Sequence, residues 1–219
     1  MQQYNITLPK SWSEVSIQAY DDLQAFVKTL KKDDNIYKTN IRFFSILSGV
    51  PYETLKNVDT NSYNACTKTL SFMNEMPKLY APREFYTLNG KRYKAYLGPK
   101  QWTAAQFIDF KTIINTESLD KKTARVISCF LSPEDCSYGY GYDSEELVNT
   151  IADYMNVEEA LSLSNFFMIE FRAFAGATLG YLEKKLQKSL SKEIPQQELN
   201  SLMEKLKLAK DSISAFGHS

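Results

Sequence analysis

The residues that could support catalysis are few, and their positions do not suit a reactive centre. His218 is the single histidine and the penultimate residue, where a chain end offers no framework to hold an imidazole. A Ser/His or Cys/His nucleophile and a histidine-containing metal centre both require such a framework. No convergent set of acid, base, nucleophile or metal ligands can be assembled from the other residues. We therefore expect no enzyme activity, no metal ion and no cofactor.

A glycine-rich segment, Tyr138-Gly139-Tyr140-Gly141-Tyr142, could suggest a phosphate-binding loop. It lacks the third glycine of the dinucleotide fingerprint and the Gly-Lys-Ser/Thr ending of a P-loop. Tyrosine combined with flexible glycine is typical of adaptable contact loops. We therefore predict an ordered aromatic loop in which Tyr138, Tyr140 and Tyr142 are candidate contacts to a partner.

Two Asp/Arg combinations occupy matching places in the chain, Asp22 with Arg42 and Asp109 with Arg125. Paired acid catalysis would need two carboxylates that converge on one cleft. A duplicated Asp and Arg is described more simply by two ion pairs, each joining successive helices. We therefore predict two intrachain Asp/Arg ion pairs, here called clamps.

The three cysteines, Cys66, Cys129 and Cys136, cannot pair completely. The last two are seven residues apart, which is outside the spacing of zinc sites. This pattern favours three free thiols in a reducing compartment.

The charges are balanced, with 26 Lys and Arg against 26 Asp and Glu, so no global field attracts nucleic acid or an anionic membrane. One local exception is the basic segment Lys91-Arg92-Tyr93-Lys94, where cations and aromatic rings interleave. Lysines also protect exposed strand edges, and a solvated hairpin explains the segment better. We do not expect direct nucleic-acid binding.

The chain has no segment suited to a membrane. The longest stretch of low charge, 160–181, contains Glu170 and Arg172 near its centre, and each would cost about 3 kcal/mol in a bilayer. The first ten residues contain no apolar stretch long enough for a signal peptide, and Pro9 would interrupt one. We expect a protein that works in the compartment where it is made.

Two segments share a pattern of apolar residues, which predicts a degenerate internal duplication. Each opens on a tryptophan, Trp12 or Trp102, and continues as an amphipathic segment. After a polar gap, each then ends on an apolar segment led by arginine, at 42–47 and at 125–130. What is repeated is apolar scaffold rather than polar chemistry, so the pattern favours packing or assembly.

In the first half, Ser11-Trp12-Ser13-Glu14 has the form of a capping box and predicts a helix directly after it. That helix would carry Tyr20, Leu23, Val27 and Leu30 on one face. Further elements are expected over later segments, namely a helix through 41–47 that ends at Ser48-Gly49, a short helix or turn at 51–57, and a helix at about 61–75.

A β-hairpin is predicted at 85–96, where residues that favour strands flank Asn89-Gly90, the dipeptide best suited to a tight turn. A second helical unit then begins at Trp102 and includes a helix at 124–131. The segment 132–135 resembles a helix start or a turn. Asp143 is expected to cap a helix that continues to Tyr154.

The last third predicts a long helix at about 162–191 and another that follows Pro195 and reaches about 215. Its apolar residues recur at intervals of three and four, which suits packing along a second helix of the same chain or of a neighbouring subunit. Ala173, Gly176, Ala177 and Gly180 form a stripe of small residues. Such a stripe allows another backbone to approach closely, and both intrachain and intersubunit contacts remain open.

The expected fold is mainly α with a small β-hairpin. Two degenerate helical repeat units flank the hairpin, and long C-terminal helices form a hairpin of their own. The corresponding ranges are 1–76 for the N-terminal unit, 77–100 for the β-hairpin insertion, 101–160 for the second unit and 161–219 for the C-terminal helices.

Several short segments resemble tail and neck proteins of tailed bacteriophages, particularly of crAss-like phages that infect gut Bacteroides. These segments are the opening 6–20, Leu-Asn-Gly-Lys-Arg-Tyr at 88–93, Gln-Phe-Ile-Asp at 106–109, Tyr-Gly-Tyr-Asp at 140–143 and Ser-Asn-Phe-Phe at 164–167. The resemblance extends over about 6–167. It implies a virion protein assembled in the host cytoplasm, a ring subunit of the neck or tail whose partners are copies of itself and portal or tail proteins. It supplies no catalytic residues.

We therefore predict a noncatalytic virion structural protein. One alternative is a tail-assembly chaperone, and a second is a nucleic-acid-binding or host-directed regulatory protein that uses the basic hairpin. The candidate interface residues are Tyr86, Leu88, Arg92, Tyr93, Tyr96, Tyr138, Tyr140, Tyr142, Gly176, Gly180, Leu199, Leu202, Leu206, Ile213 and Phe216.

Overall fold

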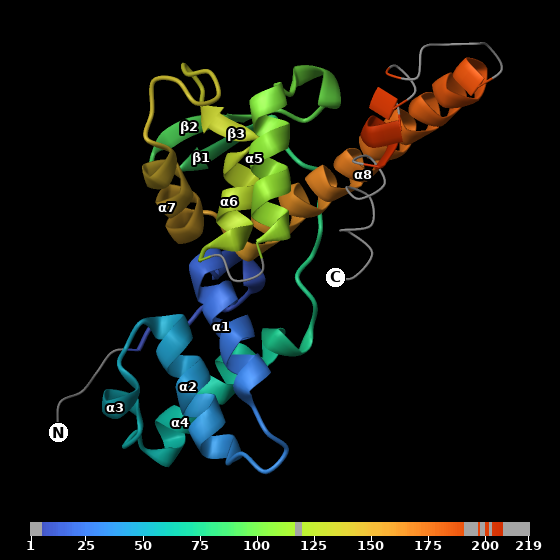
Figure 1. Cartoon of the computed structure of the whole chain (residues 1–219). Coiled ribbons are helices and arrows are strands. Elements are labelled where there is room, and N and C mark those ends of the chain that lie inside the picture. The colour runs from blue at the N-terminus through green and yellow to red at the C-terminus, as the bar shows by residue number, and fades with distance from the viewer. Residues whose placement is uncertain (1–5, 117–119, 191–196, 198–199, 202, 208–219) are drawn as a thin grey trace.

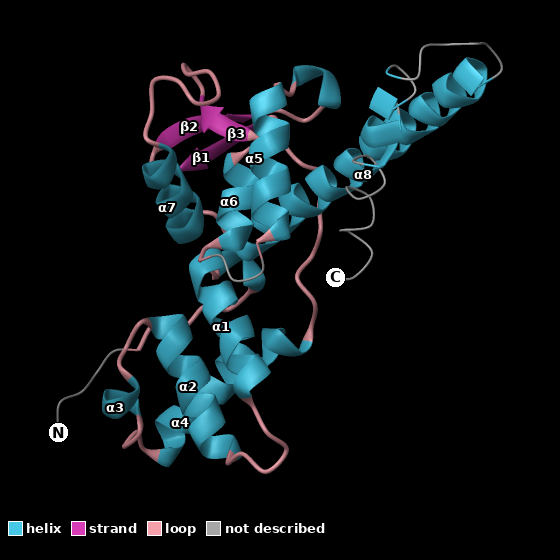
Figure 2. Cartoon of the chain, viewed as in Figure 1, coloured by secondary structure: helices cyan, strands magenta, loops and turns pink. Residues whose placement is uncertain are grey.

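A computed structural model describes residues 6–116, 120–190, 197, 200–201 and 203–207 of the chain. The protein is mainly helical, with a small antiparallel sheet of three strands and a long C-terminal helix, which confirms the expected fold class (Figure 1; Figure 2). No helix among these residues combines the length and the hydropathy needed to cross a bilayer.

The first helix, α1 (Ile17–Thr29), begins later than predicted because the capping box at Ser11 does not form. The side chain of Ser11 makes no cap hydrogen bond, and Glu14 Oε2 accepts from the backbone N–H of Lys10 at 2.9 Å. The actual N-cap is Ser16, whose Oγ accepts from Ala19 N at 3.2 Å. The chain between the two serines pairs with a distant segment, since Ser16 forms an antiparallel bridge with Asn156. Trp12–Glu14 form a single 3₁₀ turn, and the backbone is extended at Val15 and Ser16, beside this bridge.

Four further helical segments complete the N-terminal part of the chain. They are α2 (Ile36–Ser48), α3 (Tyr52–Leu55), α4 (Thr60–Thr69) and a 3₁₀ helix (Leu70–Asn74). The predicted end at Gly49 is confirmed, because this glycine adopts a left-handed conformation with φ of 69°. These segments enclose a small core that contains Leu8, Ile41, Phe44, Leu55 and Leu70.

The sheet contains β1 (Phe85–Leu88), β2 (Lys91–Ala95) and β3 (Leu131–Pro133) in that order. The hairpin is confirmed, with Leu88 paired to Lys91 across Asn89 and Gly90, whose φ angles are 46° and 72°. The third strand was missed, because 132–135 was expected to be a helix start or a turn. Pro133 lies at an edge of the sheet, where a residue without an N–H is tolerated.

The second helical part contains α5 (Ala104–Asn115), α6 (Lys122–Ser128) and α7 (Ser144–Tyr154). The helix expected at 124–131 ends at Ser128, since Leu131 already belongs to β3. A capping box is present here, because Thr103 and Gln106 exchange hydrogen bonds at the start of α5. Gln106 is buried and also donates to the carbonyl of Cys129 at 2.9 Å, so it connects α5 to the end of α6.

The last helix, α8 (Val157–Leu190), begins five residues before the predicted start. Its first half lies against the other elements of the main core, and its second half projects beyond them (Figure 1). At 1.5 Å per residue, its 34 residues span about 51 Å. The helix therefore belongs partly to the core and partly to the outer surface.

The main core is dominated by aromatic side chains. Phe110, Phe130 and Phe167 are fully buried, and the ring centroids of Phe130 and Phe167 are 4.3 Å apart. The hairpin, the second helical unit and the beginning of α8 all contribute to this core. The described residues of 77–100, 101–160 and 161–219 therefore contribute to one shared core. Ile17 of α1 also lies in it and connects it to the N-terminal helices.

The internal duplication remains a prediction. One feature is common to both halves: the indole N–H of the opening tryptophan donates a hydrogen bond to a backbone carbonyl. Trp12 Nε1 donates to the carbonyl of Glu75 at 2.7 Å, and Trp102 Nε1 donates to that of Tyr96 at 2.6 Å.

The two serines before α1 allow a direct test of the corrected cap. We expect Ser16→Ala to lower the free energy of unfolding by about 1 kcal/mol, because an amide of α1 loses its acceptor. Ser11→Ala is the matched control and should change it by no more than a few tenths of a kcal/mol, as expected for a surface residue outside a cap. Urea unfolding followed by circular dichroism measures both, and equal losses would contradict the assignment.

Candidate assembly interface

The hairpin contributes less exposed surface than predicted. Tyr86, Leu88 and Tyr93 are only 3%, 1% and 5% exposed, so these three candidate contacts are core residues. The prediction was wrong for them because helices cover the face of the sheet on which they lie. Tyr96 is half-buried against the same core, and its hydroxyl is 2.9 Å from Ser132 Oγ. Only Arg92 remains exposed, with its guanidinium 3.9 Å from the centroid of the Phe85 ring.

The basic side chains of the hairpin all lie near carboxylates. The ion-pair distances are 3.6 Å for Lys91–Glu146, 3.0 Å for Arg92–Glu134 and 3.9 Å for Lys94–Glu84. A surface that binds phosphates needs cations whose charge is not already matched by acids nearby. The geometry therefore favours a solvated hairpin over a nucleic-acid interface.

The aromatic loop is ordered by its own side chains. Tyr138 donates from its hydroxyl to Asp109 Oδ2 at 2.5 Å, and Tyr142 accepts from Gly139 N at 3.2 Å. Burial raises the pKa of both tyrosines, and the Asp109 carboxylate raises the pKa of Tyr138 further. Tyr140 is 77% exposed, so among the three candidates it offers the largest contact surface.

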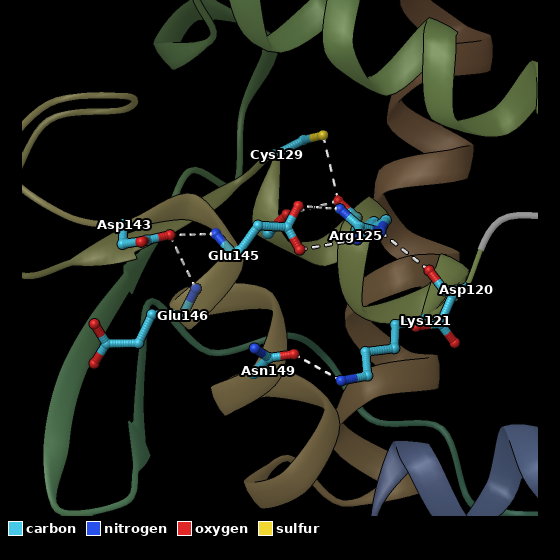
Figure 3. Close-up of polar contacts among 9 residues, drawn as sticks. Asp120, Lys121, Arg125, Cys129, Asp143, Glu145, Glu146 and Asn149 are labelled. Carbon is cyan, nitrogen blue, oxygen red and sulfur yellow. Dashed lines mark hydrogen bonds and ion pairs between the residues drawn. The ribbon is translucent and has the colours of Figure 1, made fainter.

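The predicted Asp/Arg clamps are wrong, because each of these aspartates has another partner. Asp109 binds Tyr138, and Asp22 accepts from Gln18 Nε2 of its own helix at 3.1 Å. Arg125 instead forms a two-pronged ion pair with Glu145 across α6 and α7, with N···O distances of 2.6 and 2.9 Å (Figure 3). This contact lowers the pKa of Glu145 and raises that of Arg125.

The same region contains the predicted cap of α7. Asp143 Oδ1 accepts from the amides of Glu145 and Glu146 at 2.8 and 3.2 Å (Figure 3). The cap orients the first turn of α7, and Glu145 of that turn reaches Arg125 of α6. The arrangement is structural, since the cap and the ion pair both join groups of the chain to one another.

All three cysteines are free thiols, as predicted. Cys129 is buried, which raises the pKa of its thiol to about 12, and its Sγ lies 3.4 Å from the carbonyl oxygen of Arg125. A thiol with such a pKa is not a nucleophile at neutral pH. Among the described residues, no group of three or more His, Cys, Asp or Glu side chains could hold a metal ion.

An apolar groove of about 210 Å³, here called the α5/α8 groove, lies between α5 and the middle of α8. Phe171 and Ala175 are buried, whereas Ile108 and Phe174 are 64% and 42% exposed. The rings of Phe107 and Phe174 contact each other at an interplanar angle of 40°, with centroids 4.8 Å apart. The residues that line it are Phe107, Ile108, Lys111, Phe171, Phe174, Ala175 and Thr178.

The stripe of small residues on α8 faces open space. No atom lies within 4 Å of the position that a Cβ would take at Gly176 or at Gly180. Within the described part of the chain, no other segment therefore approaches either glycine closely. The intersubunit alternative remains a prediction for both.

Most of the predicted C-terminal seam lies outside the described residues, namely Leu199, Leu202, Ile213 and Phe216. Leu206 is described, and it is half-buried in a helical stretch at 203–207.

The α5/α8 groove was not predicted from the sequence. A signal for it was present, because Ile108 lies between the buried Gln106 and Phe110 without sharing their face of α5. Phe174 and Tyr181, seven residues apart, likewise place two large aromatic side chains on one face of α8.

Comparisons with known proteins give no relative. No protein-family model, no curated protein and no solved structure matches the chain significantly.

Asp21 offers a test of the contact between the N-terminal helices and the main core. It accepts from Thr123 Oγ1 of α6 at 3.4 Å, and burial raises the pKa of its carboxyl above 3.8. The charged form therefore destabilises the fold at neutral pH. We expect Asp21→Asn to raise the free energy of unfolding at pH 7, by less than about 1 kcal/mol because solvent screens a partly exposed group.

This gain should shrink as the pH falls through the folded-state pKa of Asp21, and it should vanish below about pH 3.8. Urea titrations between pH 3 and 7 measure it. The exposed neighbour supplies the control, because Asp22→Asn removes the same charge without the same burial. A gain that is independent of pH would contradict the role given to burial.

Proposed function

We propose that the chain is a noncatalytic structural subunit of a neck or tail ring in a tailed bacteriophage. The observation that carries this proposal is the α5/α8 groove, whose apolar side chains remain exposed in the single chain. Contiguous apolar surface on a folded protein is typical of a site that another protein covers. The resemblance of segments within 6–167 to phage tail and neck proteins supplies the particular assembly.

The shape of the chain suits this role. The main core fixes the first half of α8, and the second half projects with Phe174 and Tyr181 exposed (Figure 1). A projection that carries exposed aromatic side chains can contact a neighbour in a closed ring, where one interface is repeated around the axis. Tyr140 of the aromatic loop is 77% exposed and offers a second contact surface.

A tail-assembly chaperone is the second candidate, because the same groove could hold an amphipathic helix of another virion protein. The two roles differ in the fate of the chain, since a ring subunit stays in the mature particle and a chaperone leaves. The basic hairpin gives less support to a nucleic-acid-binding or host-directed role, because its cations lie beside carboxylates.

The groove can be tested with two exposed isoleucines. We expect Ile108→Asp to abolish assembly of the full chain into rings, because a charge in an apolar contact loses its hydration without gaining a partner. Ile36→Asp is the matched control, since Ile36 is 71% exposed and lies away from the groove. Native mass spectrometry and electron microscopy of the purified variants measure assembly.

Mass spectrometry of mature particles from the phage that encodes the chain tests the assignment itself. A ring subunit should be present in stoichiometric amounts, and Ile108→Asp should be excluded from particles. Absence of the wild-type chain from mature particles, together with a complex in infected cells, would support the chaperone instead. Absence from both would overturn the proposal.

A further inference from the structure

The middle and outer parts of α8 carry an exposed face centred on Ala177. Glu170, Phe174, Ala177, Tyr181 and Lys184 follow one another at intervals of four, three, four and three, so they lie along one side of the helix. Phe174 is 42% and Tyr181 64% exposed, and both are large rings that lose apolar contact with water when a partner covers them. The face is therefore apolar at its centre and charged at its two ends.

We propose that two copies of the chain associate through this face, with their α8 helices antiparallel and a two-fold axis at Ala177. In such a pair, residues at equal distances on either side of Ala177 face each other. Glu170 and Lys184 each lie seven positions from Ala177, so each Glu170 faces a Lys184 of the second copy. The two-fold axis produces this ion pair twice.

Size complementarity follows from the same geometry. Phe174 lies three positions before Ala177 and faces Gly180, three positions after it. Gly180 has open space where a Cβ would stand, which leaves room for the ring. Tyr181 faces Ala173 in the same way, four positions to either side. Each aromatic side chain therefore meets a small residue, and the helices can approach closely.

A second copy is the occupant that the charges favour. A parallel pair in register would place Glu170 against Glu170 and Lys184 against Lys184, which is repulsive at both ends. The antiparallel pair converts both contacts into attractions. This inference goes beyond the proposed function, because the two-fold contact forms in solution whether or not the chain joins a particle.

Two glycines of α8 provide a matched test in the full-length chain. Gly176 and Gly180 are both open to solvent at the Cβ position, and leucine favours a helix more than glycine does. Gly180→Leu should weaken the dimer by at least about tenfold, because its side chain occupies the space of Phe174 from the second copy. Gly176→Leu points away from the face and should leave the dissociation constant within about twofold. Sedimentation velocity over a range of concentrations measures both, and circular dichroism checks the fold.

Exchange of the charges provides an independent test. Glu170→Lys and Lys184→Glu should each weaken the dimer by about tenfold, since each creates two like-charge contacts. A mixture of the two single variants should form a heterodimer of restored affinity, because both of its contacts are again attractive. The double variant should likewise associate with itself. Lys28→Glu, which changes an exposed lysine on α1 rather than on α8, is the control and should change little.

A cysteine at the axis reports the geometry directly. Ala177→Cys, with Cys66 and Cys136 changed to serine, should form a disulfide-linked dimer on mild oxidation, since the axis brings position 177 of both copies together. Gly176→Cys should react more slowly. A chain that stays monomeric at all concentrations would overturn the inference, and would indicate that its own C-terminal segment or another protein covers the face. Association that is equally insensitive to Gly180→Leu and to the charge changes would also overturn it.

Discussion

The fold depends on one short stretch of antiparallel backbone pairing between residues far apart in the chain. Ile17 N donates to the carbonyl of Met155 at 3.2 Å, and Val157 N donates to that of Val15 at 2.9 Å. All four side chains are almost completely buried. The pairing sets the start of α1 and the junction between α7 and α8 in a single contact, so the N-terminal helices and the main core share a fixed boundary. In a buried site, these amides and carbonyls would be costly to leave unpaired.

Aromatic packing then determines the direction in which α8 leaves the core. Phe130 contacts both Phe110 of α5 and Phe167 of α8, and Phe171 continues the contact one turn further along α8. Because α5 has 12 residues and α8 has 34, α5 supports only part of the longer helix. The α5/α8 groove lies along this boundary, where the core ends and apolar side chains continue. The groove is thus a consequence of a helix that is longer than the scaffold that supports it.

The features that could be predicted from the sequence are those fixed by neighbouring residues. Asn89-Gly90 requires positive φ angles, Gly49 ends a helix in a left-handed conformation, and Asp143 caps α7 with its own carboxylate. Ser11 had an equally good local pattern, but the residues after it form only a 3₁₀ turn before Ser16 pairs with the distant Asn156. Local signals are reliable only where tertiary contacts do not compete for the same groups.

The candidate interface was harder to predict, because exposure depends on what the rest of the chain covers. Tyrosine is a common residue at protein interfaces, but Tyr86 and Tyr93 are buried in the main core. The partner of Arg125 could not be predicted either, since Glu145 reaches it only after α6 and α7 are packed side by side. Conversely, Ile108 and Phe174 look like core residues in the sequence and are exposed.

The length of α8 also has a mechanical consequence. Its anchored half ends near Ala175, and the remaining 15 residues to Leu190 extend about 22 Å further at the rise of an α-helix. A tilt of about 10° at the anchor would displace the tip by about 4 Å, because a stiff helix transmits rotation along its axis. Small rearrangements of the phenylalanine cluster would therefore be amplified into ångström-scale movements at the far end, as in a lever arm.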